Sequence, residues 1–332
     1  CCYRMAFARG NPNGDVEVSS PPDDSVSSLC WAPTSLMLAA TSWDCSARIW
    51  QISAQGQSNP KAHTKGTSPI LTSAFAPQAQ QLVFGESSGK VQLWDLGSNA
   101  VQTMGTCAAG VSMCVANTTS NVVVTGSWDK SVKYWDLRSP QPVASVNLPE
   151  RVFCGDTVGN LTVVGSADQK YTVFDMRKPS TPYKHEKSPL KHQLRSIACF
   201  PDQTGFLIGT IEGRCAVHHV EPNMQSRNFT FKCHREQSRC YSVNAMSFHP
   251  LGTFATAGSD GTFNFWDKDS RNRLKQFKKM SGPVSAGKFS ADGSIYAYAV
   301  SYDWHKGQSG YDQNQKPRVY VHGVAQGDVA PR

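Results

Sequence analysis

The sequence lacks the features that mark a membrane protein or a familiar enzyme. No segment approaches the run of about 18 consecutive apolar residues that a transmembrane helix requires, and no basic, apolar and small-residue leader is recognisable. There is also no nucleophile elbow, Walker loop, zincin motif or dinucleotide-binding fingerprint. We therefore expect a soluble, intracellular protein that is not an enzyme and needs no cofactor, and we expect translation to begin at Met5.

Paired cysteine spacing is also absent. The 11 cysteines are odd in number and scattered through strand-like segments, which is typical of reduced core thiols rather than of a disulfide framework. Cys233, His234 and Cys240 could be drawn as part of a zinc site, but the second matched pair of ligands that such sites use is missing. The sequence therefore predicts no metal centre.

Positive charge is in excess, but only in one part of the chain. Residues 177–279 hold 17 Lys and Arg against 8 Asp and Glu, a net charge of +9, whereas the other residues hold 16 against 17, a net charge of −1. Such a section is either an ordinary solvated surface or one that attracts an acidic peptide or nucleic acid. Because no aromatic residues alternate with these basic residues, we expect any RNA binding to be weak, phosphate-directed and salt-sensitive.

One short motif recurs along the chain. Residues 126–136 read Gly-Ser-Trp-Asp-Lys-Ser-Val-Lys-Tyr-Trp-Asp, which predicts two strands joined by a tight turn. The motif and its degraded copies have their last aromatic residue at Trp50, Trp94, Trp135, Phe174, His218 and Trp266, at spacings of 44, 41, 39, 44 and 48 residues. A further strand precedes each copy, and such strands begin near residues 28, 72, 112, 152, 196, 245 and 286. A period of roughly 40 to 45 residues with four strands predicts an all-β, seven-bladed WD-repeat β-propeller.

The chain ends are expected to close this ring. Residues 16–18 and 319–321 both read as strands, so the N-terminal one should form the outer strand of the seventh blade beside the C-terminal one. The predicted organisation is a flexible segment at 1–14, a propeller at 15–324 and a C-terminal tail at 325–332. The insert at 305–318 and the connectors at 176–195 and 221–240 are candidate binding loops.

We expect the polar residues of the motif to stabilise the blade rather than to form a functional site. In WD-repeat blades the turn Asp, a strand Ser or Thr and the terminal Trp form a buried hydrogen-bonded group, often with a His from the preceding connector. We expect Asp129 and Trp135 to act in this way, with His63 and His192 as candidate histidines. The second blade has lost its turn Asp, because residues 86–89 read Glu-Ser-Ser-Gly.

Two copies of the motif continue into a Trp-Asp-x-Arg-like pattern, with Arg138 after Trp135 and Arg177 after Phe174. This pattern is found in WD-repeat substrate receptors of cullin-type ubiquitin ligases. An Arg at this position is also common in propellers that never meet a ligase. A ligase receptor therefore stays an alternative reading of the sequence.

Strings beyond the repeat consensus resemble one family across residues 15–322. They include Asp-Val-Glu-Val-Ser-Ser-Pro-Pro-Asp-Asp-Ser at 15–25, Asn-Phe-Thr-Phe-Lys-Cys-His-Arg at 228–235 and Phe-Trp-Asp-Lys-Asp at 265–269. The sequence thereby resembles the Gle-type messenger RNA export factors of the nuclear pore. The resemblance implies a monomeric adaptor, located at the nuclear envelope and shuttling to the cytoplasm, that binds a hairpin segment of an FG-repeat nucleoporin. A similar segment in mitotic checkpoint proteins and RNA are further implied partners.

The resemblance also implies a peptide-binding surface. Carried over by position, it comprises Arg214, Phe231, Lys232, Trp266, Asp267, Lys268, Arg271 and Arg273. An exposed aromatic beside guanidinium groups can bury an apolar anchor while charge-assisted hydrogen bonds hold flanking carboxylates. The alternative reading is that Trp266 only fills the blade core, because its place in the motif predicts burial.

Overall fold

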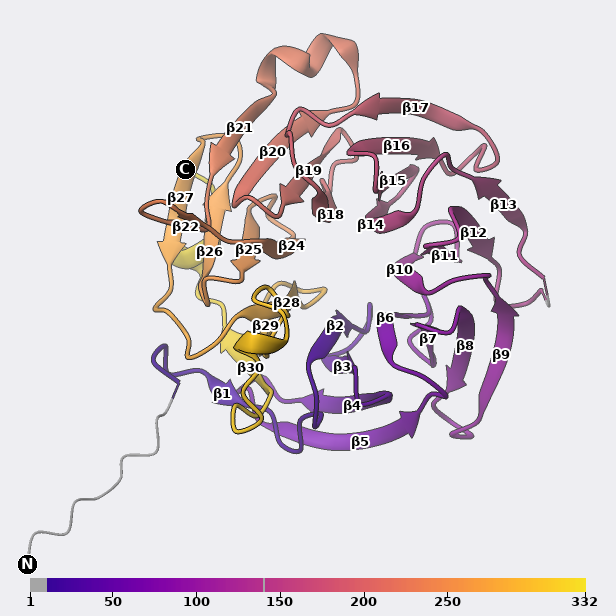
Figure 1. Cartoon of the computed structure of the whole chain (residues 1–332), viewed down its shortest axis with the longest axis horizontal. Coiled ribbons are helices and arrows are strands. Elements are labelled where there is room, and N and C mark those ends of the chain that lie inside the picture. Colours follow the sequence, from indigo (N-terminus) through magenta and orange to yellow (C-terminus); the bar gives the residue numbers. More distant parts are fainter. Residues whose placement is uncertain (1–10, 140) are drawn as a thin grey trace, which may run out of the picture.

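The computed structural model, which describes residues 11–139 and 141–332, is a ring of seven small four-stranded sheets (Figure 1). Residues of the innermost strands line a central channel. The predicted seven-bladed WD-repeat propeller is therefore confirmed. The first ten residues of the predicted 1–14 segment, with the expected start at Met5, lie outside the described residues. None of the helices in the described part is long and apolar enough to span a bilayer.

Each blade is a four-stranded antiparallel sheet, and in the first six blades the strands follow one another along the chain from the centre of the ring outward (Figure 1). The first blade contains β2 (Val26–Trp31), β3 (Met37–Ser42), β4 (Ser46–Ile52) and β5 (Ser58–Lys65). The second contains β6 (Ile70–Phe75), β7 (Gln81–Glu86), β8 (Lys90–Asp95) and β9 (Val101–Thr106). The third contains β10 (Val111–Asn117), β11 (Val122–Ser127), β12 (Ser131–Trp135) and β13 (Ala144–Asn147).

The remaining blades repeat this order. The fourth contains β14 (Val152–Val158), β15 (Leu161–Ser166), β16 (Lys170–Asp175) and β17 (Pro182–Lys187). The fifth contains β18 (Leu194–Cys199), β19 (Gly205–Thr210), β20 (Arg214–His219) and β21 (Phe229–Lys232). The sixth contains β24 (Val243–Phe248), β25 (Phe254–Gly258), β26 (Phe263–Asp267) and β27 (Asn272–Gln276).

The seventh blade is built from both ends of the chain. It contains β28 (Val284–Phe289), β29 (Ile295–Val300), β30 (Arg318–Gly323) and, as its outer strand, β1 (Val16–Glu17). Val16 pairs with Val321, and the backbone N–H of Val18 donates to the carbonyl of Val319 at 2.8 Å. The Val18 side chain is fully buried, so the predicted closure by the two terminal strands is confirmed.

The repeated motif forms strands because its alternate side chains are buried on the two faces of the sheet. In β12, alternate side chains enter the interfaces between neighbouring blades, and Tyr134 and Trp135 are both buried. The turn before this strand places Lys130 at a φ of 75°. The Trp or Phe at or near the end of the third strand is fully buried in the first four blades, at Trp50, Trp94, Trp135 and Phe174. These aromatic side chains fill the space between neighbouring sheets.

Blades five to seven carry additional segments outside their four-stranded sheets. The connector after β20 contains the 3-10 helix η1 (Pro222–Arg227), and a small hairpin of β22 (Arg235–Glu236) and β23 (Arg239–Cys240) precedes blade six. The insert in blade seven carries η2 (Gln308–Gly310). The C-terminal helix α1 (Gln326–Val329) lies on blade six, where the Thr253 hydroxyl donates to the Val329 carbonyl.

Candidate functional site

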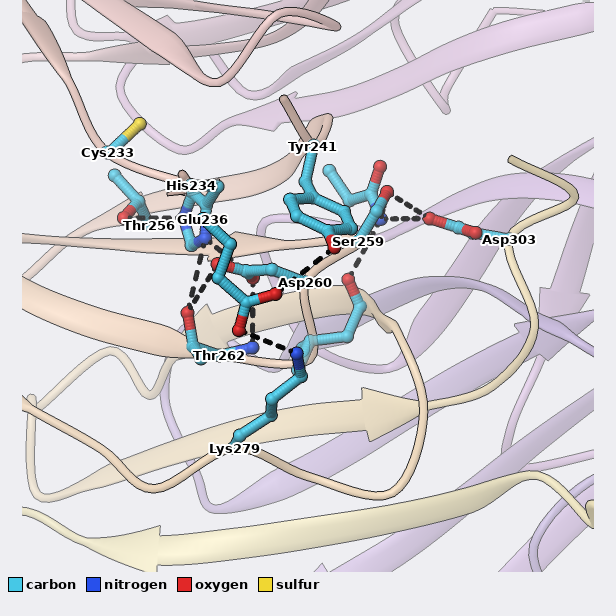
Figure 2. A network of polar contacts seen from close by, with 12 residues as sticks. Cys233, His234, Glu236, Tyr241, Thr256, Ser259, Asp260, Thr262, Lys279 and Asp303 are labelled. Carbon is cyan, nitrogen blue, oxygen red and sulfur yellow. Dashed lines mark hydrogen bonds and ion pairs between the residues drawn. The ribbon is translucent and has the colours of Figure 1, made fainter. Parts of the chain in front are cut away.

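The candidate site begins with the hydrogen-bonded group of blade six. The indole N–H of Trp266 donates to the Thr256 hydroxyl at 3.0 Å, and that hydroxyl lies 3.0 Å from Nε2 of His234. The other ring nitrogen of His234 lies 2.9 Å from the Asp260 carboxylate. Figure 2 shows His234 between Thr256 and Asp260. The turn Asp, strand Thr, Trp and connector His are therefore all joined in this blade.

The histidine of this group is not one of the two predicted from the sequence. His63 lies on the outer strand β5 and is exposed, and the exposed His192 lies 3.6 Å from Glu212. His234, by contrast, is fully buried, and it lies in the connector between β21 and β24, which leads from blade five into blade six. The prediction of His63 and His192 was wrong, and the signal that was missed is the His immediately before the hairpin β22–β23.

The two titratable members of this group, His234 and Asp260, shift each other's pKa. Burial acts to lower the pKa of His234, but its hydrogen bond to Asp260 and the charges of Cys233 and Asp260 outweigh burial and raise the pKa above its usual value. Burial acts to raise the pKa of Asp260, whereas the hydrogen bond and charge of His234 and the bonds from Thr262 lower it. Each partner thus favours the ionised form of the other.

An aromatic patch lies next to this group, on the outer part of blades five and six. We use this name for Phe229, Phe231, Trp266, Arg271 and Arg273. The Phe231 ring centroid lies 5.0 Å from that of Trp266 and 6.0 Å from that of Phe229. The guanidinium carbon of Arg271 lies 4.7 Å from the Phe229 centroid, and that of Arg273 lies 5.8 Å from the Trp266 centroid. The three aromatic residues are half-buried and both arginines are exposed.

Four of the eight predicted site residues therefore come together in this patch: Phe231, Trp266, Arg271 and Arg273. Phe229 completes the patch, although the sequence reasoning did not include it as a site residue. Its place two residues before Phe231 on one strand is the signal that could have found it, because side chains at this spacing share a face.

Arg214 and Lys232 do not belong to the patch. They pair with each other across β20 and β21, in the register next to the pair of Cys215 and Phe231. Because successive side chains of a strand point to opposite faces, the two basic residues lie on the face of the sheet turned away from Phe231. The Arg214 guanidinium lies 3.9 Å from the Glu212 carboxylate.

Asp267 and Lys268 are engaged within the protein. Burial opposes ionisation of Asp267, but its carboxylate accepts from the backbone N–H groups of Arg332 and Asp269 and from the Ser270 hydroxyl, which hold its pKa below the usual value. The Lys268 side chain is only 9% exposed, and its ammonium pairs with Asp269 at 2.8 Å and lies 5.3 Å from the Phe200 ring centroid. Both residues shape the edge of blade six and offer little surface to a partner.

A second surface, which the sequence reasoning missed, surrounds one mouth of the central channel. We call it the tryptophan mouth, and it is a hollow of about 650 Å³ lined by the exposed Trp43, Trp128 and Trp304 together with Phe153 and the arginines Arg151 and Arg195. Trp43 and Trp128 belong to the Ser-Trp-Asp turns of blades one and three, and Trp304 follows Asp303 in blade seven. Their position in turns, where nothing requires burial, is the signal that distinguishes them from the core tryptophans.

The insert of blade seven supports this mouth. The rings of Trp304 and Tyr311 are stacked, with centroids 5.7 Å apart and an interplanar angle of 9°. The Tyr302 hydroxyl donates to the carbonyl of Gly307 at 2.6 Å. These contacts tie the insert to the residues that line the hollow.

The two arginines of the ligase-type pattern are exposed, and hydrogen bonds hold each of them in one orientation. Arg138 donates to Asp136 with Nε at 2.9 Å and an Nη at 2.6 Å, and Arg177 makes the same fork to Asp175. Their side chains are 80% and 73% exposed. Each guanidinium is thus held by its own strand-end carboxylate.

Comparisons with known proteins agree on one family. The family model described as "WD domain, G-beta repeat" matches residues 16–51, 99–136 and 225–267. The chain is 41% identical to the Poly(A)+ RNA export protein of Schizosaccharomyces pombe, over 99% of this chain and 96% of that protein. It is 40% identical to Protein Rae1 of Drosophila melanogaster, over 94% of each chain. It is 41% identical to the mRNA export factor GLE2 of Chaetomium thermophilum, over 97% of this chain and 94% of that protein.

Proposed function

Because this chain belongs to the WD-repeat family of mRNA export factors, we propose that it acts in mRNA export as a non-enzymatic adaptor that binds a hairpin segment of an FG-repeat nucleoporin. Its site of action is then the nucleus and the nuclear envelope at the pore, with shuttling to the cytoplasm. Mitotic checkpoint proteins that carry a similar segment compete for the same surface.

The observation that carries this proposal is the aromatic patch. Phe231 and Trp266 present half-buried ring surface that an apolar side chain of the segment can cover. Arg271 and Arg273 lie over Phe229 and Trp266, and among the described residues neither guanidinium has a carboxylate within salt-bridge distance. An acidic residue flanking the anchor would supply that carboxylate in a charge-assisted hydrogen bond.

The tryptophan mouth supports a second contact with the same partner. Three exposed indoles around one hollow form an apolar surface of the kind that marks protein interaction sites. A hairpin has two arms, so one arm can extend across the mouth while acidic residues elsewhere in the segment reach the patch. Arg151 and Arg195 at the rim again favour an acidic segment.

The test is binding of a synthetic nucleoporin hairpin segment to the full chain, followed by fluorescence anisotropy. The double variant Arg271→Glu, Arg273→Glu should abolish binding, because both cations are replaced by like charges to the peptide's carboxylates. The matched control is Arg214→Glu, Lys232→Glu, which makes the same change in charge on the far face of blade five and should alter the affinity by no more than about twofold. Full binding by the first variant would contradict the proposal for the patch.

RNA binding is a separate part of the proposal and rests on the basic section at 177–279. If phosphates make these contacts, RNA affinity should fall steeply between low and physiological salt through counterion release. Peptide affinity, which depends on apolar burial as well as on the two arginines, should fall much less steeply over the same range. Equal salt dependence of the two ligands would contradict this division.

A receptor subunit of a cullin-type ligase is the alternative function. The exposure and fixed orientation of Arg138 and Arg177 favour it, because both guanidiniums can meet a partner without reorganising. Capture of a ligase adaptor that is lost in the variant Arg138→Ala, Arg177→Ala would support this reading. Peptide binding should be unaffected by the same substitutions.

A further inference from the structure

Two segments at the outer end of blade four share one sequence pattern. Residues 181–184 read Thr-Pro-Tyr-Lys and residues 188–191 read Ser-Pro-Leu-Lys. Of the five Ser-Pro or Thr-Pro pairs in the chain, only these two have Lys three positions after the hydroxyl residue. Proline-directed protein kinases select such a pattern, because proline brings no N–H that the enzyme would leave unpaired and the lysine can pair with acidic or phosphate groups.

The first segment lies on the surface. Thr181 is exposed in the connection between β16 and β17, and the next two residues, Pro182 and Tyr183, are exposed as well. β17 comes last in the order of its sheet, so its outer edge has no neighbouring strand within that sheet. A kinase that binds an extended substrate segment can therefore reach Thr181 while the blade stays folded.

The lysine of the first segment donates to a neutral group. Lys184 is half-buried, and its ammonium donates to the backbone carbonyl of Val220. An ammonium forms stronger hydrogen bonds with carboxylate or phosphate oxygens than with a neutral carbonyl. The bond to Val220 can therefore be exchanged for one to the kinase.

The second segment is held inside the protein. Ser188 is buried, its backbone N–H donates to the Gln169 carbonyl at 2.9 Å, and its hydroxyl accepts from the backbone N–H of Leu190 at 3.1 Å. Leu190 is only 3% exposed and belongs to the core that blades four and five share. A kinase could bind this segment only after Leu190 had left the core, so the fold distinguishes two sites that are equivalent in sequence.

We propose that Thr181 is the phosphorylation site of a proline-directed kinase and that the fold protects Ser188. In the reaction the Thr181 hydroxyl oxygen forms a bond to the γ-phosphorus of ATP, and the bond between that phosphorus and the β–γ bridging oxygen breaks. ADP leaves, and the hydroxyl proton passes to a carboxylate of the kinase.

The surroundings of Thr181 suit the phosphorylated product. The backbone N–H of Thr181 donates to the Lys178 carbonyl at 3.2 Å, and this turn brings Thr181 close to Lys178, which follows Arg177 in the chain. Residues 177–187 hold 4 Lys and Arg against 1 Glu, a net charge of +3. A phosphate adds a charge of about −1.5 to −2 and can form charge-assisted hydrogen bonds with these cations.

The test is phosphorylation of the folded full chain by a purified cyclin-dependent kinase with ATP, with the modified residues mapped by mass spectrometry. Phosphate should appear on Thr181 and not on Ser188. The control is a synthetic peptide of residues 177–195, which has no core to bury either site and should be phosphorylated on both. Lys184→Ala should lower kcat/KM for Thr181 of the full chain by about tenfold, whereas Lys184→Arg, which keeps the charge, should lower it much less.

Three results would overturn the proposal. The first is a folded full chain without phosphate on Thr181 under conditions that modify this residue in the peptide. The second is phosphorylation of Ser188 in the full chain at the rate seen in the peptide, with circular dichroism confirming that the chain is folded. The third is a peptide that the kinase leaves unmodified at Thr181, because the sequence pattern itself would then not be recognised.

Discussion

The hydrogen-bonded group of blade six can be tested by removing one hydroxyl, through Thr256→Val. This change keeps the volume of a fully buried side chain. It removes the acceptor of the Trp266 indole N–H and the partner of His234 Nε2. Each polar group left without a partner costs about 1–3 kcal/mol. Because Trp266 is only half-buried, we expect the free energy of unfolding to fall by about 2–4 kcal/mol.

Blade three supplies the matched control. Thr125 is equally buried and accepts the indole N–H of Trp135 at 2.8 Å. Within the described residues its hydroxyl makes no side-chain bond to a histidine. Thr125→Val should therefore cost about 1–2 kcal/mol, less than Thr256→Val.

Urea unfolding of both variants, with an unchanged dependence on denaturant concentration, gives the comparison. Native-state hydrogen exchange of β25 and β26 would show whether the loss is confined to blade six. An equal loss in both variants would refute the reasoning, because it would mean that His234 adds nothing to the group.

Three further predictions concern stability. Val18→Ala, at the ring closure, should lower the free energy of unfolding by about 2 kcal/mol, whereas Val16→Ala, on an exposed residue of the same N-terminal segment, should have little effect in urea unfolding. Glu86→Gln should destabilise the protein at neutral pH in the same assay. Burial opposes ionisation of Glu86, but hydrogen bonds from Thr67, Ser88 and Gln92 hold its pKa below the usual value, so this difference should vanish as the pH falls through the folded pKa. The stability difference between wild type and His234→Gln should be full between about pH 4 and 6.5, and it should shrink above this range as His234 loses its proton and below it as Asp260 gains one.

The fold could be predicted from the sequence because each blade pairs strands that follow one another along the chain. The aromatic residues that end the third strand recur at a nearly constant spacing, and most are buried where the pattern requires. The closure, although non-local, was also predictable, since a ring has only one place for a leftover N-terminal strand. Regular local pattern and closure together fix the architecture.

Blade two shows where the pattern fails. Its turn Asp is missing, but Glu86 at the end of β7 takes over the role: its buried carboxylate accepts from the Thr67 backbone N–H at 3.1 Å and from the Thr67 hydroxyl at 2.7 Å. The Ser88 hydroxyl donates to the same carboxylate at 2.9 Å. The longer side chain starts two residues earlier than Asp would and still reaches the preceding connector. A search by position for Asp cannot find this substitution.

The candidate site was predictable only in part, because residues adjacent in sequence point to opposite faces of a sheet, whereas residues of different strands come together on one face. Phe231 and Lys232 are adjacent in the chain, yet the pairing of Lys232 with Arg214 places these two cations on the opposite face from Phe231. Arg271 reaches the patch from the turn between β26 and β27, which brings it beside Phe229 of β21, and Arg273 reaches it because it pairs with Trp266 across β26 and β27. The tryptophan mouth is assembled from several blades, so the turn positions of its tryptophans do not reveal from the sequence that these side chains share one hollow.

Trp266 reconciles the two readings that its sequence position allowed. Its indole N–H points inward and is bonded to Thr256, so the residue belongs to the blade core. Its ring nevertheless stays half-buried and carries Phe231 on one side and the Arg273 guanidinium near its face. The inward hydrogen bond fixes the orientation of the ring, and a fixed ring loses little conformational entropy when a ligand covers it. The same bond that stabilises the blade therefore prepares the surface for binding, and Thr256→Val should weaken peptide affinity even in molecules that remain folded.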